Sequence, residues 1–193
     1  RMKNLYIISG CNGAGKTTTS YTVLPEILNC KEFVNADEIA KGLSPFNPES
    51  VGIEAGRLMI ARIESLLTRK ESFSIETTLA PLSYCKLIKR AQKIGYCVSL
   101  VFFWLNSPEL AMKRVAERVK NGGHDISESV IRRRYRSGLS NLFKVYLPIV
   151  DYWMIADNSV SPSVVVAEGS KQKARKIYNV ELFNTIQKNG ENE

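Results

Sequence analysis

Residues 10–19, GCNGAGKTTT, decide the fold of this chain. They follow LYIIS (5–9), a short apolar run that is typical of a buried strand in a parallel sheet. Residues 16–24 then have helical character and end near Pro25. Within this stretch, residues 10–17 match the pattern G-x-x-x-x-G-K-[S/T], and a position between a strand and a helix is where this pattern forms a phosphate-binding loop.

A loop of this kind binds the phosphates of a nucleotide. Its glycines let backbone N–H groups turn towards phosphate oxygens, and the start of the next helix adds a favourable dipole. We expect Lys16 to reach the β- and γ-phosphates of ATP and the hydroxyl of Thr17 to hold Mg²⁺, so ATP and Mg²⁺ are the expected cofactors. The residues expected to bind the nucleotide are Gly10, Asn12, Gly13, Ala14, Gly15, Lys16, Thr17 and Thr18.

The rest of the chain alternates between strand and helix patterns. Strands are expected at 33–35, 72–76, 97–105 and 153–156, and helices at 50–69 (with Ser50 as N-cap), 82–94, 108–120 and 127–146. Such alternation predicts an α/β fold with an open, mostly parallel sheet and helices on both faces, which binds ligands beyond the carboxyl ends of its strands. We therefore predict a P-loop NTPase fold of the nucleoside-kinase type.

The predicted domain organisation is a single P-loop kinase domain over residues 1–193. It includes a small helical lid at about 114–136 and a C-terminal strand and helix appendage at about 160–193. Within the appendage, an edge strand is expected at 163–169 and a helix at 180–188.

Two carboxylates are expected near the phosphates, because each follows or closes a strand of the predicted sheet. Asp37 lies just past the strand at 33–35, and Glu76 closes the strand at 72–76. A kinase needs a carboxylate that orients an acceptor hydroxyl and takes its proton, and Asp37 suits this role. Glu76 suits a role at the metal ion or the acceptor. The structural alternative for Asp37 is an N-cap for a helix at 38–42. The structural alternative for Glu76 is a hydrogen bond to a neighbouring loop.

A group of arginines forms the predicted lid. Arg114 and Arg118 are four residues apart on one helical face, and the joint NGGHD (121–125) follows them. Beyond the joint, Arg132 and Arg134 flank the apolar stripe of the next helix, whereas Arg133 is expected to point away from it. We expect Arg118 and Arg134 to stabilise charge on the phosphoryl group during transfer. His124, in the joint, is expected to cap a helix or touch phosphate.

Composition limits the partners and the compartment. The net charge is +8, which suits acidic partners, but no RNA- or DNA-binding module is recognisable and nucleic acid is not the expected partner. No apolar run approaches the roughly 18 residues that span a bilayer, so no membrane partner is expected. The four cysteines are widely spaced without a C-x-x-C pair, which favours a reduced cytoplasm.

Several segments together resemble one family. SGCNGAGKTT, NADEIA, AGRLMIARIE, FSIETTL, SPELAMKRVAERVKNGGHDI, IRRRYRSGLSNL and ADNS occur in this order and look like the short members of the zeta toxin-like family of P-loop kinases. The resemblance covers most of residues 3–159. The best-known members phosphorylate UDP-N-acetylglucosamine on a sugar hydroxyl and consume ATP.

The resemblance implies roles for individual residues. Asp37 would be the general base, Glu76 with Thr77 and Thr78 would contact the acceptor, and Asn158 would lie in the loop beside the nucleotide base. Glu76 is also expected, with Thr17, at the metal ion. The resemblance further implies a nucleotide sugar as acceptor and an antitoxin protein as partner.

The function expected from the sequence is transfer of the γ-phosphate of ATP to a hydroxyl of a small acceptor. The alternatives are a kinase for another acceptor, such as a nucleoside, an antibiotic, a polyol or a polynucleotide end, a non-catalytic ATP-binding regulatory module, and a nucleic-acid-binding ATPase. Arginines in a lid and a placed Asp37 favour catalysis, because a sensor of ATP needs neither.

Overall fold

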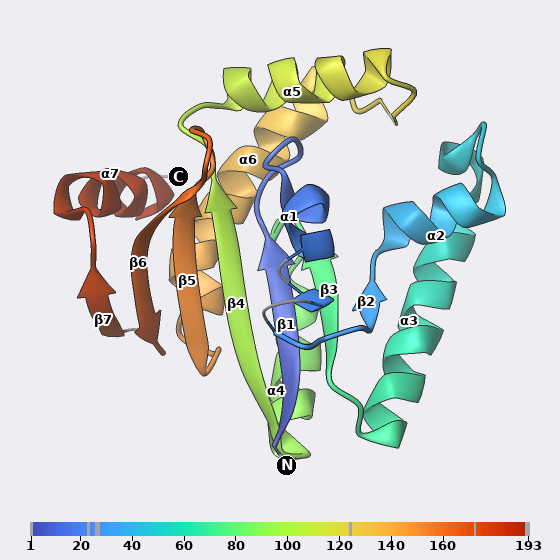
Figure 1. The fold of residues 1–193 in the computed structure, drawn as a ribbon, viewed down its shortest axis with the longest axis horizontal. Helices are drawn as coiled ribbons and strands as arrows, with labels where there is room; N and C mark the ends of the chain where they lie inside the picture. Colours follow the sequence, from blue (N-terminus) through green and yellow to red (C-terminus); the bar gives the residue numbers. More distant parts are fainter. Residues whose placement is uncertain (1, 23, 26–27, 124, 172, 192–193) are drawn as a thin grey trace.

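A seven-stranded, mostly parallel sheet forms the centre of the computed structural model (Figure 1). The structure describes residues 2–22, 24–25, 28–123, 125–171 and 173–191. Strands lie in the order β2-β3-β1-β4-β5-β6-β7. The parallel strands, in this order, are β2 (Phe33–Val34), β3 (Phe73–Thr77), β1 (Lys3–Ser9), β4 (Tyr96–Trp104) and β5 (Tyr152–Asp157).

Helices connect the parallel strands and cover both faces of the sheet. They are α1 (Lys16–Thr22), α2 (Ala36–Leu43), η2 (Pro48–Val51), α3 (Gly52–Arg69), α4 (Tyr84–Lys93), α5 (Pro108–Lys120), α6 (Glu128–Asn141), η3 (Leu142–Tyr146) and α7 (Val180–Glu191). In Figure 1, α1 lies in front of the sheet, α4 and α6 lie behind it, and α5 crosses beyond the carboxyl ends of β1 and β4. The predicted fold class is therefore confirmed.

The C-terminal part of the sheet differs from the prediction. Strand β6 (Val164–Ser170) forms where a strand was expected, but it is not the edge, because β7 (Lys173–Ile177) pairs antiparallel with its free side. The sequence KQKARK has the basic composition of solvated surface, and all five residues of β7 are indeed exposed. Its strand structure comes from pairing with β6, which composition does not reveal.

The N-cap of one helix and the type of another differ from expectation. Helix α3 begins after Val51, with no side-chain cap, while the Ser50 hydroxyl donates to the carbonyl oxygen of Asn47. The helix predicted at 127–146 runs as α6 to Asn141 and then continues as the π-helical segment η3. The predicted helix at 16–24 is described as α1 only to Thr22, and residue 23 lies outside the described residues.

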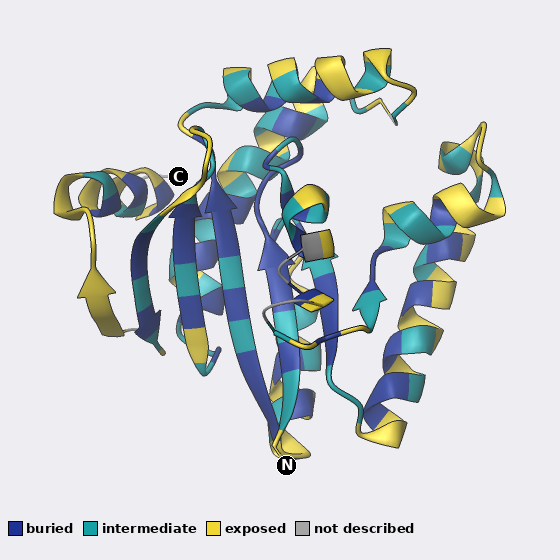
Figure 2. Ribbon diagram, in the orientation of Figure 1, coloured by how far each residue is buried: buried dark blue, intermediate teal, exposed yellow. Residues whose placement is uncertain are grey.

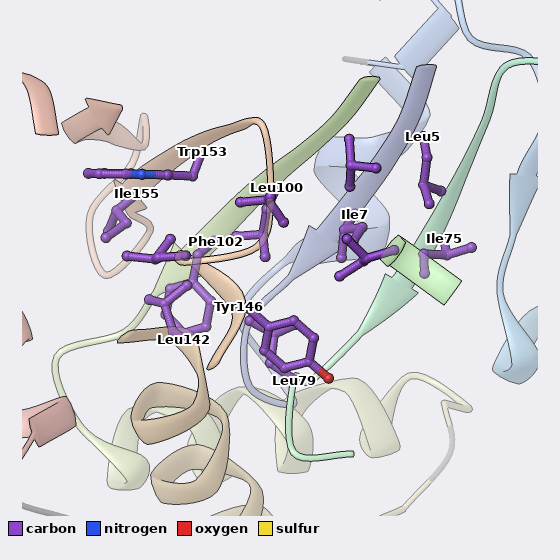
Figure 3. Close-up of a cluster of buried hydrophobic side chains, with 14 of the residues drawn as sticks. Leu5, Ile7, Ile75, Leu79, Leu100, Phe102, Leu142, Tyr146, Trp153 and Ile155 are labelled. Atoms are coloured by element: carbon purple, nitrogen blue, oxygen red, sulfur yellow. The ribbon is translucent and has the colours of Figure 1, made fainter. Parts of the chain in front are cut away.

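The main hydrophobic core lies between the sheet and the helices behind it. Alternate bands of buried and partly buried residues run along the strands in Figure 2, as expected for strands with a helix-covered face. The close-up in Figure 3 shows Phe102, Trp153 and Ile155 of the sheet near Leu142 and Tyr146 of η3. A second cluster, which includes Ile8, Phe103, Ala111 and Val115, packs α5 against the start of the phosphate loop.

Candidate nucleotide and phosphoryl-transfer site

The phosphate loop between β1 and α1 has the backbone that its glycines predict. Gly13 and Gly15 have φ values of 78° and 79°, which L side chains rarely adopt. A Cβ on Gly13 would lie 2.7 Å from the carbonyl oxygen of Ala111, and one on Gly15 would lie 2.5 Å from Nδ2 of Asn158. Both positions therefore need glycine because α5 and the loop after β5 press against the phosphate loop.

Lys16 opens α1 and its side chain is only 7% exposed. Its Nζ donates to the carbonyl oxygen of Cys11 at 2.9 Å and lies 3.8 Å from Oε1 of Glu76. Burial lowers the pKa of Lys16, while the charges of Glu76 and, less strongly, Cys11 and Asp37 raise it. The ammonium group is thus held inside the loop by one carbonyl and one carboxylate.

Glu76, at the carboxyl end of β3, contacts several other side chains of the site. Its Oε2 accepts hydrogen bonds from the hydroxyl of Thr17 at 2.8 Å and from Nδ2 of Asn35 at 2.9 Å. Burial raises the pKa of Glu76, and the nearby Lys16 and the Thr17 hydrogen bond oppose that rise. The predicted position of Glu76 beside Lys16 and Thr17 is what the structure shows.

Asn35 is a functional candidate that the sequence reasoning missed. It is the N-cap of α2, since its Oδ1 accepts from the backbone N–H groups of Asp37 at 2.8 Å and Glu38 at 3.4 Å. The alternative of Asp37 as an N-cap is therefore wrong, because Asp37 lies within the first turn of α2. The signal that could have found Asn35 is an asparagine directly after a strand and before a helix.

Asp37 and Glu76 line one cavity of about 540 Å³ at the carboxyl edge of the sheet. Thr77 and Thr78, which follow Glu76, line it too. Their hydroxyls accept from the backbone N–H groups of Leu79 at 3.1 Å and Ala80 at 3.4 Å and so shape the turn after β3. The four residues expected at the acceptor are thus brought together. The other lining residues are Asn12, Lys16, Asn35, Ala36, Ala80, Pro81, Tyr84, Arg133, Arg134 and Ser137.

The arginines of α6 have different partners. Arg134 Nη1 donates to Oδ1 of Asn12 in the phosphate loop at 3.3 Å, and Arg132 pairs with Glu109 of α5 at 2.6 Å. Arg133 is exposed and points away from the apolar stripe, as expected. It also lines the cavity beside Arg134, which the sequence did not predict, because the apolar stripe identifies only the inner face of a helix.

The arginines of α5 lie near the phosphate loop. Arg114 Nη2 donates to the carbonyl oxygen of Ser159 at 3.5 Å, and its Cβ is close to Gly13. The charge of Arg118 contributes to lowering the pKa of Lys16. His124, in the joint between α5 and α6, lies outside the described residues.

Asn158 contacts the back of the phosphate loop. Its Nδ2 donates to the carbonyl oxygen of Ala14 at 2.6 Å, and its backbone N–H donates to the carbonyl oxygen of Trp104 at 2.9 Å. It therefore ties the ends of β4 and β5 to the loop. Thr18, one residue into α1 from Thr17, is exposed.

Helix α6 is anchored to the turn that follows β3. Nδ2 of Asn141 donates to the carbonyl oxygens of Leu79 at 2.8 Å and Ala80 at 3.1 Å. Gly138 allows the carbonyl of Thr78 to approach so closely that a Cβ there would overlap its oxygen. The C-terminal half of α6 and the Thr78 turn are therefore one packed unit.

The oxygen donors at Thr17 and Glu76 fit a magnesium ion. The Thr17 hydroxyl and the Glu76 carboxylate meet at 2.8 Å beside the phosphate loop. Mg²⁺ in nucleotide sites is typically bound by one or two protein oxygens together with phosphate oxygens and water. The described residues offer no group of three or more His, Cys, Asp or Glu side chains for a metal ion, so a metal there would depend on phosphate oxygens.

The strand order, the loop between β1 and α1 and the carboxylate at the end of β3 together define a P-loop NTPase of the nucleoside-kinase type. The model of the family described as Zeta toxin matches residues 1–163. The chain belongs to this family, and the resemblance read from its motifs is confirmed. The described residues form no helix that is long and apolar enough to cross a membrane.

Several proteins resemble the chain. An uncharacterised protein of Haemophilus influenzae is 32% identical over 126 residues, which are 65% of this chain and 88% of that protein. The structure of AvrRxo1-ORF1 with AvrRxo1-ORF2 has a TM-score of 0.78 at 19% identity, and the match covers 96% of this chain and 64% of that one. The same pair was also solved with ATP, with a TM-score of 0.76.

A third similar structure comes from the PezAT toxin–antitoxin system of Streptococcus pneumoniae. Its TM-score is 0.64 at 17% identity, over 98% of this chain and 86% of that chain. These solved structures show similarity of fold. The present chain spans about two thirds of the length of the chain that it matches in the AvrRxo1-ORF1:AvrRxo1-ORF2 structure.

Proposed function

We propose that this protein is a kinase that transfers the γ-phosphate of ATP to a hydroxyl group of a small acceptor. The observation that carries the proposal is the convergence of Lys16, Thr17 and Asn35 on Glu76, with Asp37 in the same cavity. A phosphate loop alone would suit any ATP-binding module. A second carboxylate beside it, in a cavity large enough for an acceptor, supports phosphoryl transfer.

The donor side of the cavity holds the nucleotide. Backbone N–H groups of residues 10–17 and the ammonium of Lys16 bind phosphate oxygens, and Asn158 supports the loop from behind. Thr17 and Glu76 would hold Mg²⁺, which supplies neutralisation of phosphate charge when bound. Arg134 is positioned by Asn12 and, with Arg118, stabilises charge on the phosphoryl group in transit.

The acceptor side begins at Asp37 and the turn after β3. Asp37 takes the proton of the attacking hydroxyl, because its side chain lines the cavity and its backbone is fixed by the Asn35 cap. Glu76, Thr77 and Thr78 orient the acceptor. The predicted lid at about 114–136, which includes Arg118, closes over the reacting groups and excludes water. The C-terminal half of α6 keeps its contact with the turn after β3 through Asn141.

The resemblance to the zeta toxins makes UDP-N-acetylglucosamine the first acceptor to test. AvrRxo1-ORF1 was solved with a partner protein, and PezAT is a toxin–antitoxin system. We therefore also propose an antitoxin protein as a partner of this chain. Dependence on ATP and four free cysteines support the cytoplasm as the compartment.

The deciding experiment offers the protein Mg-ATP together with nucleotide sugars, nucleosides, polyols and oligonucleotides, and reads each acceptor by mass spectrometry. A gain of one phosphate on a hydroxyl-bearing acceptor is expected, and UDP-N-acetylglucosamine is expected to respond first. An Asp37→Asn variant is the control for contaminating kinases. ATP binding without phosphate on any acceptor would favour the regulatory module instead.

A further inference from the structure

The turn that follows β3 has an unusual backbone conformation. Leu79 has a φ of 60°, in the left-handed region that residues other than glycine rarely adopt. Its side chain is fully buried, so glycine could not replace it without leaving a cavity in the core. A conformation of this kind persists only where the surrounding structure holds it, and it is common at active sites. The contacts that hold this turn therefore bear on the function of the site.

This turn forms one wall of the cavity that holds the predicted acceptor side. Four residues of the segment line the cavity: Thr77, Thr78, Ala80 and Pro81. The hydroxyls of Thr77 and Thr78 accept hydrogen bonds from the backbone N–H groups of Leu79 and Ala80. Because a hydroxyl that accepts a hydrogen bond can also donate one, each threonine can still offer its proton to a ligand. The path of the turn thus sets the direction in which both hydroxyls point.

The carbonyl groups of the same turn are held by the end of α6 and by η3. Nδ2 of Asn141 donates to the carbonyl oxygens of Leu79 at 2.8 Å and Ala80 at 3.1 Å. The hydroxyl of Tyr146 donates to the carbonyl oxygen of Pro81, and Tyr146 lies with Leu79 in the main core cluster (Figure 3). Two side chains therefore fix three successive carbonyls, and neither of these side chains lines the cavity.

The π-helical segment η3 places both side chains on one side of the helix. Asn141 and Tyr146 are five residues apart, and in a regular α-helix this spacing separates two side chains by about 140° around the axis. Here the backbone N–H of Leu147 donates to the carbonyl oxygen of Leu142 at 2.9 Å, which is the i to i+5 pattern of a π-helix. Hydrogen bonds with this spacing bring residues five apart nearly into line along the axis. The π-helical turn therefore lets both side chains reach one turn of the chain.

We propose that Asn141 and Tyr146 are positioning residues that hold the left-handed turn at Leu79 and so aim Thr77 and Thr78 at the acceptor. They act through the backbone of the turn and do not touch the reacting groups. The nucleotide is held by the phosphate loop, which these two side chains do not contact, so ATP binding should not depend on them. This inference rests on the proposed kinase function and assigns two residues that control its acceptor side.

The test compares Asn141→Ala with Gln92→Ala. Gln92, on α4, is a matched control because its Nε2 also donates to two oxygens, the carbonyl of Ile149 at 2.8 Å and Oδ2 of Asp151 at 3.1 Å, before the start of β5. Both amides are half-buried, so both variants should lower the Tm to a similar extent.

Steady-state kinetics are measured with UDP-N-acetylglucosamine, or with whichever acceptor of the panel gains phosphate. Asn141→Ala should lower kcat/KM for the acceptor about 10- to 100-fold, because the threonine hydroxyls are no longer aligned. The affinity for a non-hydrolysable ATP analogue, measured by calorimetry, should stay at the wild-type value. Gln92→Ala should match the wild type in both measurements.

Tyr146→Phe removes a single hydroxyl group and is the milder variant. It should lower kcat/KM for the acceptor about 2- to 10-fold, as expected for the loss of one neutral hydrogen bond. The double variant with Asn141→Ala should lose less than the product of the two single losses, since both side chains hold the same turn.

Three results would overturn the positioning role and leave the kinase function intact. They are wild-type acceptor kinetics in Asn141→Ala and Tyr146→Phe, an equal loss of activity in Gln92→Ala, and a loss of ATP affinity that matches the loss of activity. Phosphate transfer to no acceptor by the wild type would instead reject the kinase function, and this inference with it.

Discussion

Gly138→Ala tests whether the packing of α6 on the acceptor turn controls the site. A Cβ at this position would overlap the carbonyl oxygen of Thr78 and lie 3.5 Å from its carbon, and these are backbone atoms, which cannot move aside as the end of a flexible side chain could. Overpacking of this kind costs about 1–3 kcal/mol, while alanine in place of a helical glycine returns roughly 0.5–1 kcal/mol. We therefore expect a net loss of about 1–2 kcal/mol in the free energy of unfolding and a Tm lower by about 2–8 °C.

The same variant should lose activity, because the helix and the turn must separate by roughly 1 Å, and a displacement of that size at reacting groups can cost about 100-fold in rate. Thermal unfolding and acceptor kinetics measure the two effects. Gly56→Ala is the matched control, since Gly56 is also inside a helix but a Cβ there would meet nothing within 4 Å. Gly56→Ala should be slightly more stable and fully active. If Gly138→Ala behaves in the same way, the tight joint between α6 and the turn does not exist in solution.

Three further predictions concern the donor site and the base. Lys16→Ala should weaken Mg-ATP binding by about 1.5–3 kcal/mol, because a charged contact to the phosphates is lost, and unchanged affinity in calorimetry would contradict this. Asp37→Asn should lower the transfer rate ~10²–10⁴-fold with little change in ATP affinity, and transfer at the wild-type rate would place the base elsewhere. Arg118→Lys and Arg134→Lys should reduce kcat far more than ATP affinity, and matching losses of affinity at unchanged kcat would make both arginines nucleotide-binding groups only.

The parts of the site that sequence could predict are those that follow directly from local pattern. The phosphate loop is contiguous, so glycine spacing and its place between a strand and a helix suffice to locate Lys16 and Thr17. Asp37 and Glu76 were located because carboxyl ends of parallel strands meet at one edge of the sheet. Their presence in one cavity confirms that argument, and their chemical roles stay predictions.

The parts that could not be predicted depend on contacts between distant segments. Asn35 reaches Glu76 across 41 positions of the chain, and Asn141 reaches Leu79 across 62. The periodicity of α6 identifies which residues face the core, but not which flank of the helix meets a cavity, so the place of Arg133 at the cavity could not be predicted. The pairing of β7 with β6 is similar, because exposed basic residues carry no alternation between polar and apolar positions.

Strand β7 also affects whether molecules of the protein can associate through the edge of the sheet. The outer backbone edge of a terminal strand can accept a strand from another molecule, which is a common route to aggregation. Here that edge carries Lys173, Arg175 and Lys176, all exposed, on a chain whose net charge is already +8. A second copy that approached this edge would bring the same positive charges against it. The charge pattern therefore keeps identical molecules apart at the place where the sheet could otherwise grow.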